Sequence, residues 1–265
     1  MQSELKFFNE LVTKLLEKER SEPVVEPLPT SSVIADLDLG FSDEGMLEED
    51  WQKVVENAVM HTPRTASKLF FNQLFGGRQP KAVIGDLLAV ILNNSMYTYK
   101  AAGPQVGVEK VILREACTIL GWDESSDGTF APGGSLTNFM SMVMARDAAD
   151  KSTPHSGVTQ KMTVYTSMES HYSIPKNAAF SGVGRDQVRY VPSDVVGRMD
   201  LNALEAMIEE DIEKGYKPIM VNLTAGTTVL GAFDPVGEVR AIGDKYDLWL
   251  HLDGAYCGSV IFSQK

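Results

Sequence analysis

The sequence has few cysteines, a shortage of positive charge and no long uncharged apolar run. Two cysteines in 265 residues are too few for a disulfide framework or a cysteine-rich zinc site. A net charge of −12 argues against nucleic-acid or anionic-membrane partners, which need a basic surface, and is typical of a solubilising surface. The N-terminal segment lacks the apolar core of a secretory signal, and no run reaches the length of a membrane span. We therefore expect a soluble, cytoplasmic protein.

The rest of the composition is that of an ordinary globular protein. Apolar residues make up 43% and charged residues 23% of the chain, whose length suits one large or two smaller domains. An amphipathic helix over residues 4–19 is predicted by apolar residues at helical spacing, namely Leu5, Phe8, Leu11, Val12, Leu15 and Leu16. A proline-rich linker, 21–34, and an acidic segment, 36–50, lead into another helix. Residues 1–65 are predicted to form an N-terminal helical arm and linker.

Residues 66–265 have the pattern of an α/β domain. Helices are predicted over 80–100, 105–120 and 136–149. From Met162 onward, predicted strands (162–166, 187–191, 218–223 and 248–253) alternate with predicted helices (172–182, 201–215 and 235–246). Such alternation, with nearly continuous apolar strands, predicts a mainly parallel sheet with helices on both faces. Cys117 lies in a helical pattern and is predicted to be a small core residue.

A glycine-rich turn at residues 131–135 precedes one of these helices. Free backbone N–H groups and the positive end of the helix dipole make such a turn suitable for a phosphate group. Ser135 and Thr137 add hydroxyl groups, so Gly134 and Ser135 are candidates for a phosphate cup. A plain helix cap, with Ser135 as the capping residue, would explain the same residues.

Polar residues also follow the ends of three predicted strands. They are His171, the turn Thr224–Thr228 and Asp253. Ligands of open α/β sheets bind beyond the carboxyl ends of the strands, although a structural histidine or a tight glycine turn would give the same pattern. His251 shares a strand face with Asp253, which favours a buried, neutral, hydrogen-bonded role. No metal site is predicted, because no ligand pair has a recognised zinc spacing.

These motifs bring a phosphate cup, an imidazole, a threonine turn and a carboxylate to one edge of one sheet. A flat, phosphorylated ring that contains nitrogen would use all four groups. A carboxylate paired with a pyridine nitrogen stabilises the protonated ring, which is then a better electron sink. The sequence therefore predicts pyridoxal 5′-phosphate as the cofactor.

From about Phe70 onward, the chain resembles the group II pyridoxal-phosphate-dependent amino-acid decarboxylases, which act on glutamate, cysteine sulfinate, aspartate or aromatic amino acids. The resemblance is carried by ordered motifs: 70–74 (FFNQL), 96–99 (MYTY), 132–135 (PGGS), 170–173 (SHYS), 222–228 (NLTAGTT), 231–235 (GAFDP) and 249–256 (WLHLDGAY). The first two motifs look more like the branch with acidic substrates. The resemblance implies a fold-type I large domain that binds pyridoxal phosphate.

The resemblance also implies roles for individual residues. His171 would stack on the cofactor ring and Asp253 would pair with its pyridine nitrogen, which makes these two the catalytic candidates. Ala255 would pack beneath the ring, and Asp234 would support hydrogen bonds at its side. Gly134, Ser135 and Thr228 would lie around the cofactor. Candidates for the substrate end are Asn72, Gln73 and Thr98.

The implied activity is decarboxylation of a small, acidic L-amino acid such as glutamate, aspartate or cysteine sulfinate. In such enzymes the reaction passes through aldimine and quinonoid intermediates. A homodimer with shared active sites is implied as well, and the amphipathic helix near the N-terminus is consistent with exchange between subunits.

The sequence departs from the family pattern in two ways. Gly254 stands where alanine is common, which removes one methyl group. The chain also stops before the expected position of the Schiff-base lysine, and neither Lys176 nor Lys265 matches that lysine. We therefore expect an incomplete large domain, without its last strands and the C-terminal small domain. Two alternatives remain open: an inactive fragment or interaction module, and another fold-type I enzyme, such as an aminotransferase or a lyase.

Overall fold

A computed structural model describes residues 1–26, 28–41 and 43–263, so Lys265 lies outside the described residues. The chain divides into two units, residues 1–94 and residues 95–265, and each is described by itself. The predicted domain boundary after residue 65 falls inside the first unit. The assignment of residues 66–94 to a cofactor-binding domain therefore stays a prediction.

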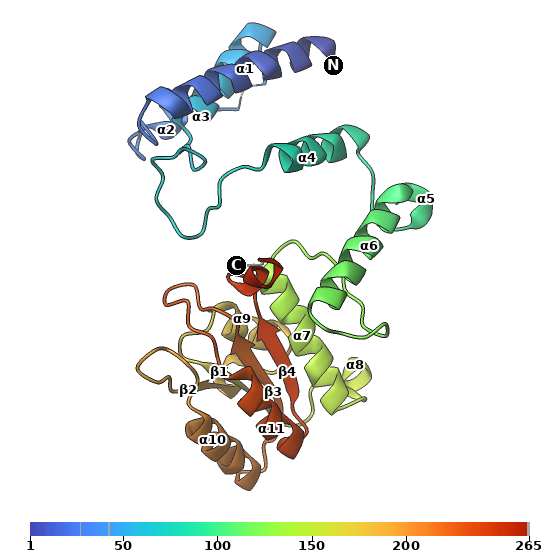
Figure 1. Cartoon of the computed structure of the whole chain (residues 1–265). Coiled ribbons are helices and arrows are strands. Elements are labelled where there is room, and N and C mark those ends of the chain that lie inside the picture. The colour runs from blue at the N-terminus through green and yellow to red at the C-terminus, as the bar shows by residue number, and fades with distance from the viewer. Residues whose placement is uncertain (27, 42, 264–265) are drawn as a thin grey trace. The chain divides into compact units, whose positions relative to one another are not determined.

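The first unit is helical. Its elements are α1 (Gln2–Ser21), α2 (Val33–Asp36), α3 (Glu48–His61) and α4 (Pro80–Leu92). Helix α1 packs against α3 (Figure 1), where the rings of Phe7 and Trp51 lie 5.5 Å apart and Lys14 pairs with Glu56 at 2.8 Å. The helix predicted over residues 4–19 is confirmed. Three carboxylates in the first turn of α3 favour its N-terminus, because the helix dipole is positive there.

The helix predicted over residues 80–100 was too long. Helix α4 ends at Leu92, and Asn93 follows in the left-handed conformation with φ 48° and ψ 40°. Asparagine tolerates this conformation better than most residues, so it terminates the helix. The second unit then begins with α5 (Tyr99–Ala102) and α6 (Pro104–Ile119). Cys117 is 5% exposed on α6, as predicted for a core residue.

The second unit contains the predicted sheet. Its strands are β1 (Met162–Ser167), β2 (Val188–Val191), β3 (Lys217–Thr224) and β4 (Trp249–Asp253), all parallel in the order β2-β1-β3-β4. The larger helices are α7 (Gly134–Ala149), α9 (Ser173–Phe180), α10 (Leu201–Glu213) and α11 (Val236–Tyr246). Shorter helical turns are α8 (Thr153–Ser156), η1 (Arg185–Gln187) and η2 (Gly258–Phe262).

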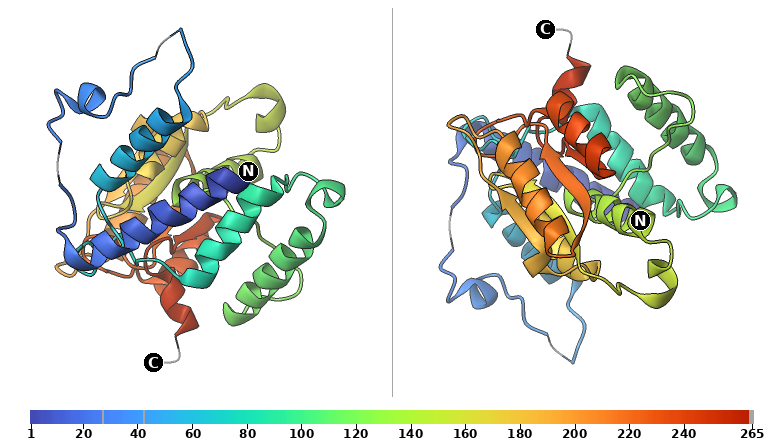
Figure 2. Two further views of the ribbon diagram at one scale, coloured as in Figure 1. Left: turned by 90° about the horizontal axis from the view of Figure 1, so that it is seen from above. Right: turned by 90° about the horizontal axis from the view of Figure 1, so that it is seen from below.

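Helices lie on both faces of this sheet (Figures 1 and 2), and each face has its own hydrophobic core, as expected for parallel strands. Helices α7 and α9 cover one face, where Met142 and Ile174 pack with Val164. Helices α10 and α11 cover the other face, where Leu204 and Val239 pack with strand residues such as Val221. Side chains alternate between the two faces along the strands, except at a bulge in β3 where Ile219 and Met220 both face the first core. The predicted α/β fold class is confirmed, and no helix in the described part of the chain could cross a membrane.

A buried polar cluster fixes β1 and β2 to α10. Asp211 is 3% exposed, and its carboxylate accepts hydrogen bonds from the Tyr165 hydroxyl at 2.7 Å and from Arg189 Nη2 at 2.8 Å. Arg189 Nε also donates to both carboxylate oxygens, at 2.9 and 3.1 Å. Burial, reinforced by the Asp211 carboxylate, raises the pKa of Tyr165 above its ordinary value. The phenol therefore stays protonated and remains a donor.

Replacing Asp211 by alanine should lower the free energy of unfolding by roughly 3 kcal/mol, because it leaves Arg189 and the Tyr165 hydroxyl without their acceptor. Urea unfolding followed by circular dichroism measures this change. Asp244→Ala is the matched control, since it breaks an exposed pair with Arg240 on α11 and should have little effect. An equal decrease in the free energy of unfolding of both variants would contradict the stabilising role of the cluster.

Candidate active site

The predicted site residues of the second unit gather at the carboxyl edge of the sheet. The register of β3 and β4 sets Thr224 beside Asp253, and β1 ends shortly before His171. Helix α7 begins at Gly134 and packs on β3 and β4. The structure therefore brings together the four motifs that the sequence analysis singled out.

Asp253 is buried and held by two donors. Its Oδ1 accepts the backbone N–H of Ala255 at 3.0 Å, and its Oδ2 accepts Asn138 Nδ2 at 2.8 Å. The Asp253 backbone carbonyl also accepts the N–H of Ala225 at 2.8 Å, which joins the two strand-end turns. A carboxylate oxygen has two acceptor sites, so Asp253 can accept a further donor.

The His171 imidazole is half-buried and held by Ser173. The backbone N–H of Ser173 donates to His171 Nδ1 at 3.2 Å, and Ser173 Oγ lies 2.8 Å from the same nitrogen. A backbone N–H can only donate, so Nδ1 is the acceptor and the ring proton resides on Nε2. The ring lies 4.2 Å from that of Tyr172, tilted by 36°.

The start of α7 lies against the turn that follows β4. A Cβ atom added to Gly134 would come within 2.9 Å of Ala255 Cβ, so glycine permits this close approach. The Ser135 carbonyl accepts Asn177 Nδ2 at 2.9 Å, which fixes the first turn of α7 to α9. The predicted cup residue Gly134 therefore lies beside Ala255, the residue expected beneath the cofactor ring.

The threonine turn after β3 packs on the same segment. Gly226 has φ 90°, and a Cβ there would collide with Cys257, so the turn requires glycine on both counts. Thr227 Oγ1 accepts the N–H of Ala232 at 3.1 Å, and Thr228 is half-buried next to it. Thr224 Oγ1 is buried and has no hydrogen-bond partner in the described part of the chain.

Asp234 anchors the end of β3. Its Oδ1 and Oδ2 accept the backbone N–H groups of Met199 and Thr224, each at 2.8 Å. Burial raises the pKa of Asp234 above its ordinary value, and these two hydrogen bonds oppose that shift. The contacts assign Asp234 a structural function here, and its support of the cofactor ring stays a prediction.

His251 lies on the α7 side of β4, as its register with Asp253 predicts. Its Nε2 is 2.7 Å from Asn138 Oδ1. Burial lowers the pKa of His251, against an opposing effect of the Asp253 charge. The structure thus gives His251 the neutral, hydrogen-bonded environment that the sequence favoured. In residues 1–26, 28–41 and 43–263, no three His, Cys, Asp or Glu side chains form a group that could hold a metal ion.

Sequence reasoning assigned no role to Asn138 or Ser173, yet both contact the catalytic candidates. Asn138 is 1% exposed and Ser173 is equally buried. One signal was available for Asn138: asparagine is disfavoured inside helices, and this one lies four residues after Gly134, on the same helix face. Ser173 belongs to a quoted motif, but nothing local distinguishes it from a helix cap.

Two of the three candidates for the substrate end lie outside the second unit. Asn72 and Gln73 belong to the first unit and are exposed, and Asn72 Oδ1 accepts the N–H of Leu74 at 2.8 Å. Thr98 is exposed at the start of α5, where its carbonyl accepts the N–H groups of Ala101 and Ala102. Their contact with a substrate stays a prediction.

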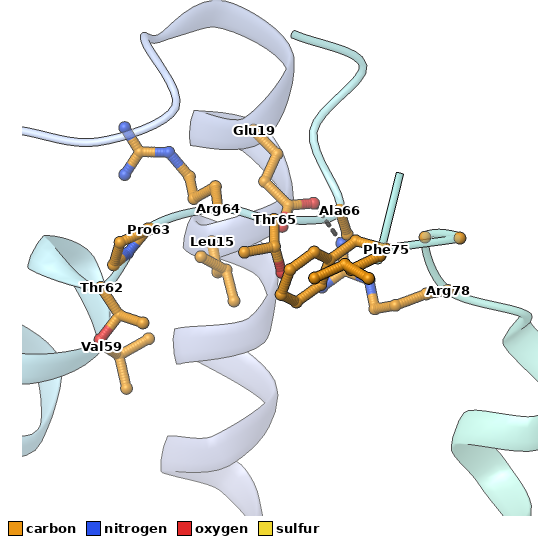
Figure 3. A pocket seen from close by; sticks show the side chains of 13 residues that line it. Leu15, Glu19, Val59, Thr62, Pro63, Arg64, Thr65, Ala66, Phe75 and Arg78 are labelled. Atoms are coloured by element: carbon orange, nitrogen blue, oxygen red, sulfur yellow. Dashed lines mark hydrogen bonds and ion pairs between the residues drawn. The ribbon is translucent and has the colours of Figure 1, made fainter. Parts of the chain in front are cut away.

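A cavity of about 380 Å³ lies within the first unit (Figure 3). Arg78 pairs with Glu19 of α1, and Phe75 also lines the cavity. The loop that lines it, Leu74–Arg78, directly follows Asn72 and Gln73 in the chain.

A family model described as the pyridoxal-dependent decarboxylase conserved domain matches residues 34–265. The chain belongs to this family. Family membership confirms the resemblance and, with it, pyridoxal 5′-phosphate as the cofactor.

Individual relatives agree with this assignment. The chain is 38% identical over 230 residues to cysteine sulfinic acid decarboxylase of Mus musculus, covering 86% of this chain and 46% of the relative. It is 36% identical over 231 residues to acidic amino acid decarboxylase GADL1 of Xenopus tropicalis, covering 86% and 45%. The crystal structure of mouse CSAD in apo form matches with a TM-score of 0.93 and 36% identity, covering 97% of this chain and 55% of that one. The chain spans about half the length of the curated relatives it matches.

The donors and acceptors at the sheet edge fit pyridoxal phosphate. Asp253 retains acceptor capacity for a ring N–H, and the start of α7 provides backbone donors for a phosphate. The buried Thr224 hydroxyl, which has no partner among the described residues, lies at the register position beside Asp253. A bound polar group would satisfy it.

The environment of His251 predicts a pH dependence of stability. Because its native pKa lies below the ordinary value of 6.5, unfolded His251 takes up a proton while the native side chain stays neutral. The free energy of unfolding therefore does not depend on this group above about pH 6.5. Below that pH it falls by up to about 1.4 kcal/mol per pH unit. Urea unfolding between pH 8 and 5.5 measures this slope.

His251→Gln should flatten the slope, since glutamine can still donate to Asn138 but does not titrate. His155→Gln, at an exposed position on α8, should keep the slope of the unmodified protein. Identical slopes for His251→Gln and the unmodified protein would contradict the assignment.

Proposed function

We propose that the protein is a pyridoxal-phosphate-dependent carboxy-lyase that acts on a small acidic L-amino acid: glutamate, aspartate or cysteine sulfinate. The observation that carries this proposal is the buried Asp253 carboxylate, held at the end of β4 by Asn138 and the Ala255 N–H. A carboxylate so placed suits a cofactor with a protonated ring nitrogen. The cofactor of the family has such a ring.

When bound, pyridoxal phosphate accepts the electron pair that remains on Cα after carbon dioxide leaves. Asp253 would hold a proton on the pyridine nitrogen, because its negative charge favours the protonated ring. His171 would cover one ring face with its Nδ1 turned toward Ser173. The backbone at Gly134 and Ser135, with Thr228, would bind and orient the phosphate end. Ala255 would support the opposite side of the ring.

The acidic substrate class is supported by the relatives, which are named cysteine sulfinic acid decarboxylase and acidic amino acid decarboxylase. The motifs with Asn72, Gln73 and Thr98 also look more like that branch than the aromatic one. We propose these three residues for the substrate end, and Asp234 for support of the cofactor ring.

We further propose a cytoplasmic homodimer with shared active sites. Support comes from α4, which has no buried residue and exposes Ile84, Leu88 and Ile91, because an apolar helix face of this kind is typical of interfaces. Analytical ultracentrifugation gives the oligomeric state directly.

Carbon dioxide release from carboxyl-labelled amino acids tests the activity. With added pyridoxal phosphate, we expect release from L-cysteine sulfinate, L-aspartate or L-glutamate. The kcat/KM for L-tryptophan should be at least about a hundredfold lower, because an indole leaves the polar groups at the substrate end unpaired. Equal or faster release from L-tryptophan would contradict the acidic class. Cofactor binding without release from any substrate would favour the inactive fragment or interaction module over an active decarboxylase.

Asp253→Asn should lower kcat by at least about a hundredfold, because the neutral amide no longer stabilises a protonated ring nitrogen. The Kd for pyridoxal phosphate should change less than tenfold, since the phosphate contacts remain. Absorbance titration gives Kd, and the same release assay gives kcat. Asp244→Asn, on the exposed face of α11, is the control for loss of a negative charge. Unchanged turnover in Asp253→Asn would remove its assigned role.

A further inference from the structure

Asn138 is the point where the hydrogen bonds of the site meet. Its Nδ2 lies 2.8 Å from Asp253 Oδ2 and 3.0 Å from Ser173 Oγ, and its Oδ1 lies 2.7 Å from His251 Nε2. The side chain is 1% exposed, so water does not compete for these contacts. One amide thus uses both donor hydrogens and its acceptor oxygen within the site.

The direction of each bond follows from the chemistry of the partners. An ionised carboxylate only accepts, so the atom of Asn138 that faces Asp253 must be the NH2 group. The carbonyl oxygen then faces His251, which must donate from Nε2. On the other side, Ser173 Oγ accepts from Asn138, and its own hydroxyl hydrogen points to His171 Nδ1. Nδ1 is already an acceptor, because the Ser173 backbone N–H donates to it.

We propose that Asn138 is a positioning residue that aligns Asp253 and His171 for the cofactor and holds His251 in its Nε2–H form. This inference rests on the proposed function for its cofactor part. A rotation of the amide by 180° would set its oxygen against the carboxylate and its NH2 group against a donor. The amide therefore has one orientation, and that orientation fixes both the carboxylate and the imidazole through Ser173.

Four variants test the proposal. Asn138→Leu keeps the shape of the side chain and removes all three hydrogen bonds, whereas Asn138→Asp keeps an acceptor for His251 and removes the donors. Ser173→Ala breaks only the branch toward His171. The matched control is Ser141→Ala, one turn further along α7, where the hydroxyl accepts Trp249 Nε1 of β4 at 2.9 Å.

The first measurement needs no cofactor. In ¹⁵N-histidine NMR, the unmodified protein and Ser141→Ala should show a slowly exchanging Nε2–H resonance that is absent in His251→Gln. Asn138→Leu should lose this resonance, and Asn138→Asp should keep it. A resonance that persists in Asn138→Leu, or an Nδ1–H form of His251 in the unmodified protein, would overturn the assigned orientation.

The second measurement is titration with pyridoxal 5′-phosphate, followed by absorbance. Both Asn138 variants should raise Kd by about threefold to tenfold, because a misaligned Asp253 weakens the contact with the ring nitrogen while the phosphate contacts remain, and Ser173→Ala should raise it by less, about twofold. Ser141→Ala should bind like the unmodified protein. A Kd for pyridoxal 5′-phosphate that is the same in Asn138→Asp and in the unmodified protein would overturn the positioning role. Circular dichroism shows whether each variant is folded.

The two measurements separate failure of this inference from failure of the proposed function. If the unmodified protein binds no pyridoxal phosphate, the proposed function fails together with the cofactor part, and the NMR result alone decides the orientation of Asn138. If the unmodified protein binds and the Asn138 variants match the control, only the positioning role fails.

Discussion

Parallel pairing of β3 with β4 is the constraint on which the site depends. The register places Thr224 beside Asp253 and Asn222 beside His251. Alternation of side chains then turns Trp249, His251 and Asp253 to the face covered by α7. Because β1 runs in the same direction on the other side of β3, the segment with His171 leaves the sheet at the same edge. A slip of one residue in β4 would turn Asp253 away from α7.

Helix α7 packs on this edge of the sheet and adds its own residues to the candidate site. Its first residue, Gly134, lies against Ala255, and its next turns present Asn138 and Ser141 to β4. Three hydrogen bonds join this helix to β4, two from Asn138 near the end of the strand and one from Ser141 at its start, in addition to the hydrophobic contacts around Met142. The same packing that stabilises the domain also fixes its chemical groups.

Much of the fold could be predicted because its signals are local. Strand–helix alternation from Met162 onward and the helix near the N-terminus depend on periodicity within a few turns, and both were right. The end of α4 depended on one asparagine in a left-handed conformation, which the apolar pattern around it concealed. Of the candidate site, motifs predicted Asp253 and His171, whose roles stay predictions. Asn138 was missed, because it contacts residues 35, 113 and 115 positions away and no local pattern encodes such partners.

The three hydrogen bonds of Asn138 have a thermodynamic consequence. A buried side chain held by three hydrogen bonds has little rotamer freedom left to lose. The carboxylate and the imidazole that it holds are therefore ordered before any ligand arrives. Binding of a rigid planar ring to such a site incurs little entropic cost from the protein, so most of the contact energy can appear as affinity.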